Sequence, residues 1–154
     1  MKKIFLLFVS VALLLNLCAC GGQEAAKEPE PSALAESLLK GNVFSVSLDE
    51  LPASKAASFY ELNASDVAEA LLYHAAGTSK EQIVILKATD ETAAGNVVTS
   101  LKNLVARWIE ADRDYAPQEV PKLEKAVLRQ SGAWVVLVIA NDPDTAAKIV
   151  GEYI

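Results

Sequence analysis

Two segments of the chain carry the same order of apolar stretches and turns, and this repetition limits the fold more than any other sequence feature. The first segment runs from Ala68 to Ala94 and the second from Leu123 to Ala147. They align at a shift of 55 residues up to a glycine, Gly77 or Gly132, and at a shift of 53 residues after it. Each copy is typical of a strand, a turn at the glycine, a second strand and a helix. The alternative is chance similarity between two segments rich in alanine and valine, but the order of elements does not depend on homology.

Capping residues mark where the helix of each copy begins. Thr89 and Asp90 precede the first helix, and Asp142 with Pro143 precedes the second. The first helix is predicted over residues 91–112, with an apolar stripe formed by Ala94, Val97, Leu101, Leu104 and Trp108. The C-terminal helix carries a matching stripe, formed by Ala146, Ile149, Val150 and Tyr153. Both helices are therefore expected to pack one face against a sheet.

These patterns predict an α+β fold. We expect a two-layer domain in which an antiparallel sheet, built from a ββα-ββα pseudo-repeat, carries its helices on one face. The apolar run 134–140 is nearly continuous, as in a central strand. Short elements precede the repeat: a helix between Pro31 and Gly41 with Ser32 as its N-cap, an edge strand over 43–48 and a helix over 54–62. Residues 32–154 are predicted to form a single domain.

The N-terminal residues have the three parts of a secretory signal. Lys2 and Lys3 precede an apolar run from Ile4 to Leu17, and small residues follow it. The run is shorter than the roughly 20 residues that a membrane-spanning helix needs. Residues 1–19 are therefore predicted to be a cleaved signal peptide.

The sequence Leu17-Cys18-Ala19-Cys20 resembles the lipobox of bacterial lipoproteins. The resemblance implies cleavage between Ala19 and Cys20 and attachment of a diacylglyceryl lipid, with acyl chains such as palmitate, to the Cys20 thiol. Two acyl chains are enough for stable anchoring in a membrane. Cys18 is a poorer candidate because bulky Leu17 precedes it. The alternative is conventional cleavage nearby, which would leave Cys20 as an idle thiol.

Residues 20–31 are predicted to be the lipidated cysteine and a disordered tether, because the segment after Cys20 is polar, contains prolines and has no aliphatic side chain larger than alanine. Loss of Lys2 and Lys3 with the signal lowers the basic side chains from 14 to 12 against 20 acidic ones, a formal net charge of −8. Such an acidic domain is not expected to bind nucleic acid or anionic lipid, so attachment to the cell membrane would depend on the lipid alone.

Few side chains are available for catalysis or metal binding. The chain has one histidine, and both cysteines precede residue 21. His74 can be read as a general base or as a polar surface residue on a strand. We predict no catalytic residue, no metal site and no cofactor.

Acidic residues gather at the predicted end of the long helix. Glu110, Asp112 and Asp114 occur there, and Glu119 follows in the connector. Oxygen ligands of this kind can bind calcium, but the spacing does not match an EF-hand loop. A solvated acidic helix terminus is the alternative that we favour.

The connector between the two copies contains an aromatic residue and two prolines. Tyr115 and Pro117 can form a partner-binding lip, because a conformationally fixed loop presents side chains at low entropic cost. The alternative is a rigid loop in which Tyr115 folds over the edge of the core.

Taken together, the motifs resemble an uncharacterised bacterial lipoprotein family defined by domain of unknown function 4358. The resemblance depends on the lipobox, the polar tether and four stretches: Phe59-Tyr60-Glu61-Leu62, Tyr115-Ala116-Pro117, Leu123-Glu124-Lys125-Ala126-Val127 and Ser131-Gly132-Ala133-Trp134-Val135-Val136. It covers residues 32–154. It implies an envelope lipoprotein with one α+β domain, and it supplies no catalytic residues.

Two classes of function are consistent with these observations. We expect a non-enzymatic binding module, lipid-anchored on the outer face of the cytoplasmic membrane, whose partner is an envelope protein or another envelope component. The alternative is a small-ligand receptor or an envelope hydrolase that uses carboxylates such as Glu110 and Asp112. A cleft lined by those two residues and His74 would favour the alternative.

Overall fold

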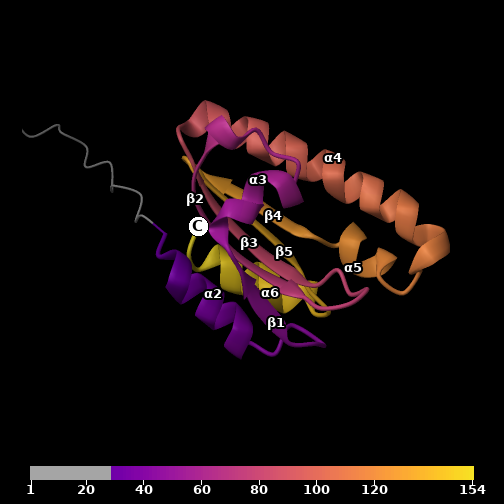
Figure 1. The fold of residues 1–154 in the computed structure, drawn as a ribbon. Helices are drawn as coiled ribbons and strands as arrows, with labels where there is room; N and C mark the ends of the chain where they lie inside the picture. The colour runs from indigo at the N-terminus through magenta and orange to yellow at the C-terminus, as the bar shows by residue number, and fades with distance from the viewer. Residues whose placement is uncertain (1–28) are drawn as a thin grey trace, which may run out of the picture.

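An antiparallel sheet of five strands forms the centre of the computed structural model, which describes residues 29–154. Its strand order is β1-β2-β3-β5-β4 (Figure 1). The strands are β1 (Leu48–Leu51), β2 (Val67–Ala75), β3 (Gln82–Ala88), β4 (Val127–Ser131) and β5 (Trp134–Ile139). The helices are α2 (Pro31–Lys40), α3 (Ala56–Phe59), α4 (Glu91–Tyr115), α5 (Val120–Glu124) and α6 (Pro143–Gly151), with short 3-10 turns at Ala53–Lys55 and Ala64–Asp66. The predicted α+β fold is confirmed.

The predicted signal peptide, Ala19, Cys20 and most of the tether lie outside the described residues. Within residues 29–154, no helix combines the length and the hydropathy that crossing a bilayer requires.

The ββα order of both copies is confirmed. The β2–β3 and β4–β5 hairpins turn at Gly77 and Gly132, whose φ angles are +76° and +54°. Glycine adopts such angles without steric penalty. The predicted helix caps are confirmed as well: the Asp90 carboxylate accepts a hydrogen bond from the Ala93 amide at 2.7 Å, and Asp142 accepts one from the Thr145 amide at 3.1 Å.

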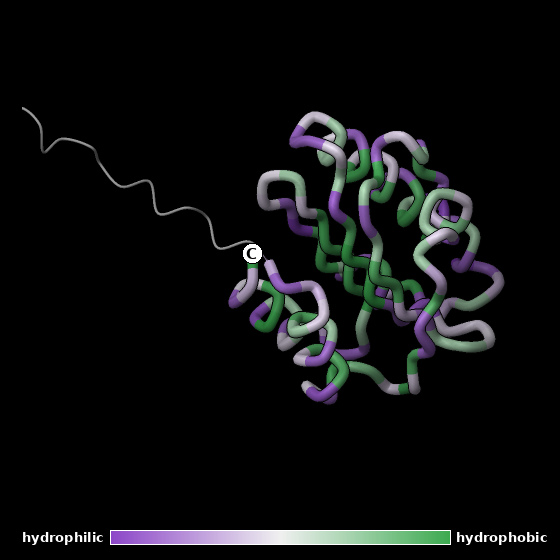
Figure 2. Tube along the Cα trace, turned by 60° about the vertical axis from the view of Figure 1, so that its left-hand side comes forward, coloured by the Kyte–Doolittle hydropathy of each residue, from purple (hydrophilic) through white to green (hydrophobic). Residues whose placement is uncertain are grey.

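The predicted helix layer on one face is wrong, because helices cover both faces of the sheet (Figure 1). On one face, α3 and α4 pack on side chains that include Val84, Leu86, Val135 and Leu137. On the other face, α2 and α6 pack on Ile83, Ile85, Val136 and Val138. Successive strand residues point to opposite faces, and β3 and β5 are apolar at nearly every position, so both faces need a cover. Figure 2 shows these central strands as the most hydrophobic part of the sheet.

The two copies are not related by a rigid symmetry. Strands β3 and β5 are antiparallel neighbours, with Ile85 opposite Val136. The two-fold rotation that exchanges such neighbours runs perpendicular to the sheet and would keep both following helices on one face. Because α4 and α6 lie on opposite faces, the copies share an order of elements but do not superpose.

Three N-terminal predictions need correction. Helix α2 begins at Pro31 with Glu30 as its N-cap, so Ser32 lies inside the helix. Residues 43–47 form a loop instead of the first part of a strand, and the edge strand β1 starts only at Leu48. The helix predicted over 54–62 is shorter because Glu61 has a φ of +52°, which ends the helical conformation.

The start of the second copy also differs from the prediction. Leu123 and Glu124 belong to α5, a short helix with Pro121 in its first turn, and β4 begins at Val127. Proline is favoured in this position because its missing N–H would have no partner there. The long helix α4 extends three residues past the predicted end, to Tyr115, and its predicted apolar stripe does face the core.

Candidate functional site

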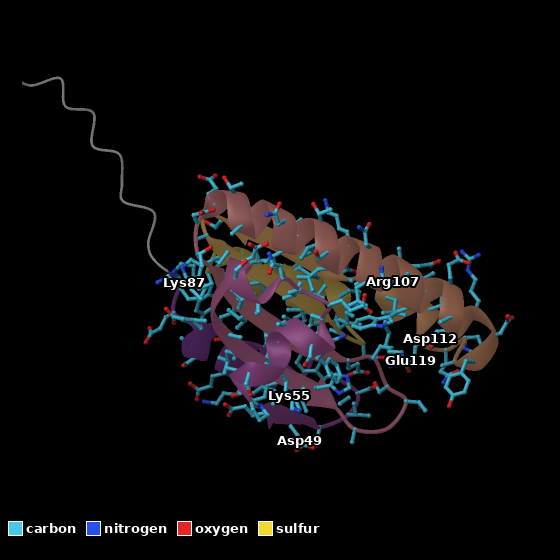
Figure 3. The ribbon with its side chains drawn as sticks, turned by 45° about the horizontal axis from the view of Figure 1, so that its top comes forward. Asp49, Lys55, Lys87, Arg107, Asp112 and Glu119 are labelled. Carbon is cyan, nitrogen blue, oxygen red and sulfur yellow. The ribbon has the colours of Figure 1, made fainter. Side chains whose placement is uncertain are left out.

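A cluster of three buried carboxylates and two partly buried lysines lies at the end of the sheet where the β2–β3 turn meets the connector between α4 and α5. Five side chains form it, and we call it the charge cluster: Lys80, Glu81, Asp112, Glu119 and Lys122. Figure 3 shows Asp112 on α4 and Glu119 in the connector at this end of the molecule. The fold therefore gathers charges from the β2–β3 turn, α4, the connector and α5.

Lys122 is the link between two buried carboxylates. Its Nζ lies 2.8 Å from Glu81 Oε1 and 3.1 Å from Glu119 Oε1. Glu81 has no solvent exposure, and its other oxygen accepts a hydrogen bond from the Ser45 amide at 2.7 Å. The Ser45 hydroxyl also donates to Glu81. The loop after α2, the start of β3 and α5 are thus held together by one carboxylate.

Glu119 performs a second role, because it fixes the β2–β3 turn. Its Oε2 accepts hydrogen bonds from the Lys80 amide at 2.8 Å and from the Ser79 hydroxyl at 3.4 Å. The Lys80 ammonium reaches α4, where it lies 3.3 Å from Asp112 Oδ2 and 5.8 Å from the centre of the Trp108 ring. These contacts attach the β2–β3 turn to the connector on one side and to α4 on the other.

The charge cluster keeps its central pair ionised. Burial acts to raise the pKa of Glu81, but hydrogen bonds from Lys122 and Ser45 outweigh it and hold this pKa below the usual value. Burial likewise acts to lower the pKa of Lys122, but Glu81 and Glu119 raise it above the usual value. A general acid or base works best with a pKa near the working pH. Both shifts move away from neutrality, so this pair is suited to holding the fold.

Tyr115 and Pro117 project from the connector that the charge cluster anchors. Tyr115, the last residue of α4, is 79% exposed, and Pro117 is also exposed. Between them Ala116 is buried, and its amide donates to the Asp112 carbonyl at 2.9 Å. Tyr115 does not fold over the edge of the core, so that alternative is wrong. The connector is fixed by its buried residues and presents its aromatic side chain outward.

The acidic residues named as calcium ligands do not converge. Asp112 is only 3% exposed and faces Lys80, whereas Glu110 and Asp114 are exposed, and Glu110 lies 3.5 Å from Arg113. In the part of the chain that the structure describes, no three histidine, cysteine or acidic side chains are grouped so that they could hold a metal ion. Neither the calcium interpretation nor a hydrolase centred on Glu110 and Asp112 gains support.

His74 lies on β2, as predicted, and is half-buried. Its ring packs edge-on against Phe59, with the ring centres 5.1 Å apart. Burial lowers the pKa of His74, and nearby Lys80 acts in the same direction. The lowered pKa favours the neutral imidazole, and the ring serves as an aromatic packing partner of Phe59. Of the four pockets described within residues 29–154, none is lined by both His74 and Glu110.

The sequence patterns did not identify Lys80, Glu81 and Lys122 as members of a functional or structural cluster. The sequence gives little indication that these side chains are buried, since isolated charges next to apolar segments usually face solvent. The nearest indication is the position of Glu81, directly before a strand that is apolar at nearly every position and so must be buried at both faces.

Comparison with known protein families identifies a relationship over most of the described domain. No curated protein and no solved structure matches the chain significantly. The family model described as "Domain of unknown function (DUF4358)" matches residues 44–140, which is more than half of the chain and includes β1 to β5 and the whole charge cluster. The chain belongs to the DUF4358 family.

Proposed function

We propose that this protein is a membrane-anchored bacterial lipoprotein whose domain is a non-enzymatic binding module on the outer face of the cytoplasmic membrane. The observation that carries the proposal is the charge cluster, which fixes a connector whose aromatic residue, Tyr115, is 79% exposed. A rigid, exposed aromatic side chain is a common anchor of protein interfaces, because little conformational entropy is lost when it binds.

The state of the buried charges favours binding over catalysis. Each carboxylate of the charge cluster has a lysine partner at 3.3 Å or less. Breaking a buried pair of this kind is costly, so these groups are poorly suited to exchanging protons with a substrate. Their chemistry supports a structural role.

The orientation of the domain agrees with a tethered module. Pro31, at the start of α2, and Trp134, at the start of β5, line the same pocket. Strand β5 ends at Ile139 opposite Gln82, next to the charge cluster, so the tether would join the domain at the other end of the sheet (Figure 1). From Cys20 to Pro31 the chain makes eleven residue-to-residue steps, which at about 3.3 Å each allow about 36 Å between the bilayer and the domain. The Tyr115 end would then lie opposite the attachment point of the tether and remain accessible to a partner.

Photocrosslinking in intact cells tests this proposal. Tyr115 is replaced by a photoreactive phenylalanine derivative, and the same replacement at Phe59, which is 42% exposed elsewhere on the surface, is the control. We expect a defined protein adduct from position 115 and none of the same mass from position 59. Equal adduct patterns from the two positions, or no adduct from position 115, would contradict a binding face at the connector.

The anchor is tested separately with Cys20→Ala. We expect the variant to lack the lipid by mass spectrometry and to leave the membrane fraction, with loss of the Tyr115 adduct. A variant that remains firmly membrane-bound would show that Cys20 is not the anchor.

A further inference from the structure

Strand β4 forms one edge of the sheet, and an apolar groove runs beside it. The groove has a volume of about 290 Å³ and is bounded by α4, α5 and β4. Its apolar lining includes Val105, Ala106, Ile109, Leu123, Ala126, Leu128 and Leu137. We call it the β4 groove. Apolar side chains and a sheet edge therefore lie side by side on the surface.

The backbone of β4 is open on its outer side. Among the described strands, β4 pairs only with β5. The Leu128 carbonyl oxygen accepts a hydrogen bond from the Arg129 guanidinium at 3.3 Å, in an exposed position. An extended peptide can replace this single side-chain contact with a ladder of main-chain hydrogen bonds.

The opposite edge of the sheet is less suitable. Strand β1 has four residues, two of which are Asp49 and Glu50, and Pro52 follows it. Short length, charge and proline are features that prevent a strand from joining an edge. Strand β4 contains no proline and no acidic residue.

The two faces of β4 differ, and this defines the side chains that a joining strand needs. Leu128 packs on the α4 face, within the β4 groove. Arg129 pairs with Val136, which belongs to the α2 and α6 face, so Arg129 lies on that other face. Because side chains alternate along a strand, one set of partner residues would enter the β4 groove and the next set would lie near Arg129.

Unpaired basic side chains surround this edge. Lys102 lines the β4 groove, and Lys125 and Arg129 flank its lining residues Ala126 and Leu128. All three are exposed, and within residues 29–154 none of them forms an ion pair, although the chain as a whole carries a net charge of −6. Glu124 is the single acidic residue of the lining. The local positive charge is complementary to an acidic ligand.

We infer that the β4 groove binds an extended segment of a partner protein with alternating apolar and acidic residues, added to the sheet as a strand beside β4. The inference rests on the proposed function and adds the chemistry of the partner. Apolar residues of the segment fill the groove, and its acidic residues meet Arg129 on the opposite face. Lys102 in the groove lining and Lys125 beside it add positive charge to the same edge. A second copy of the chain is a poor occupant, because two β4 strands side by side would bring their Arg129 side chains together.

Peptide titration tests the inference. The purified full chain is titrated with a fluorescent peptide of alternating valine and glutamate, slightly longer than β4, and binding is followed by anisotropy. Comparison peptides have valine alternating with lysine, or the same valines and glutamates in blocks. In the protein, Ala106→Glu adds a negative charge to the exposed wall of the β4 groove, and Ala111→Glu makes the same change on the same helix outside that groove.

We expect the alternating valine–glutamate peptide to bind at least about tenfold more tightly than either comparison peptide, as complementary charge and register require. Ala106→Glu and Arg129→Glu should each weaken binding about tenfold or more, and Ala111→Glu should leave it unchanged. The inference would be overturned if the valine–lysine peptide bound as tightly as the valine–glutamate peptide. It would also be overturned if Ala106→Glu and Ala111→Glu lost the same affinity, or if no peptide bound.

Two further readouts distinguish a partner strand beside β4 from a second copy of the chain and from a partner that binds at Tyr115 alone. A dimer by analytical ultracentrifugation that Ala106→Glu dissociates would mean that a second copy occupies the groove, and would overturn the inference. If the peptides fail while the Tyr115 adduct persists in cells, strand addition at β4 is wrong and the proposed binding module stands.

Discussion

The ammonium nitrogen of Lys122 lies 2.8 Å from the carboxylate of Glu81, a residue with no solvent exposure. The same nitrogen lies 3.1 Å from the Glu119 carboxylate, so one ammonium group forms ion pairs with two buried carboxylates. Charges removed from water in this way are stable only while each retains its partner.

Lys122→Met should therefore strongly destabilise the domain. The substitution keeps much of the side-chain volume but leaves Glu81 and Glu119 without their cation, which costs about 3–5 kcal/mol for a buried pair. Urea unfolding followed by circular dichroism measures the loss. Lys148→Met, a change at an exposed position of α6, is the control and should shift stability by less than about 0.5 kcal/mol. Similar midpoints for the two variants would show that the charge cluster contributes little.

The same pair predicts how stability depends on pH. The pKa of Glu81 is lowered from 4.5 in the folded protein, so the unfolded chain binds the proton more readily. The ionised Glu81 carboxylate therefore stabilises the folded state. Its contribution is complete above about pH 4.5 and is lost as the pH falls through the folded-state pKa. Lys122 behaves in the opposite sense: its pKa is raised from 10.5, so its contribution is complete below that pH and is lost as the pH rises through the folded-state pKa.

Urea unfolding at a series of pH values between about 7 and 3 checks the acid limb. Glu81→Gln should be less stable at neutral pH and should lose less stability on acidification than the wild type. Parallel pH profiles for the two proteins would mean that another group causes the acid sensitivity.

The buried hydroxyl of Tyr60 offers a second test of polar satisfaction in the core. It donates a hydrogen bond to Gln82 Oε1 at 2.8 Å, and both side chains are inaccessible to solvent. Tyr60→Phe leaves this amide oxygen without its donor, which should destabilise the domain by about 1–3 kcal/mol. Thermal unfolding measures the effect. Tyr73→Phe, which removes a longer, exposed contact of 3.5 Å to Glu50, is the matched control.

A double variant tests whether the loss of stability in Tyr60→Phe comes from the unpaired Gln82 amide. Combining Tyr60→Phe with Gln82→Met removes both polar groups and should recover part of the stability lost in Tyr60→Phe. A double variant that shows the full sum of the two single losses would indicate that the hydrogen bond itself matters little.

Two glycines should respond in opposite directions to the same substitution. Gly132 has a φ of +54°, so Gly132→Ala should destabilise the β4–β5 turn by about 1 kcal/mol. Gly95 lies inside α4 with nothing within 4 Å of the added Cβ, so Gly95→Ala should stabilise the domain by about 0.5–1 kcal/mol. The denaturant concentrations at the unfolding midpoints of the two variants and the wild type measure both effects. A loss of stability in Gly95→Ala would contradict this expectation.

The sequence predicts the parts of this fold that depend on neighbouring residues. The caps at Asp90 and Asp142, the glycine turns and the stripe of α4 are local patterns, and the structure has all of them. The choice of face for α6 is not local, because Ile83, Val84 and Ile85 look alike in sequence and only packing decides which helix each one meets.

The charge cluster could not be predicted for the same reason. Lys80 and Lys122 are far apart in sequence, and each resembles a solvated surface residue. Only the hairpin turn, the connector and α5 bring their partners Asp112 and Glu81 within reach. Exposure of Tyr115, in contrast, is one of two interpretations that the sequence allows for the connector, and the anchoring of Ala116 and Glu119 decides between them.

Helices on both faces of the sheet make the two halves of the chain interdependent. The central strands β3 and β5 each supply alternate residues to two separate cores, and the helix after β3 covers one core while the helix after β5 covers the other. Helix α2 shares the second core with α6, so that core is complete only when the N-terminal helix and the second strand–strand–helix unit come together. The domain should therefore melt in a single cooperative transition, and fragments divided at the connector should fold only when they are mixed.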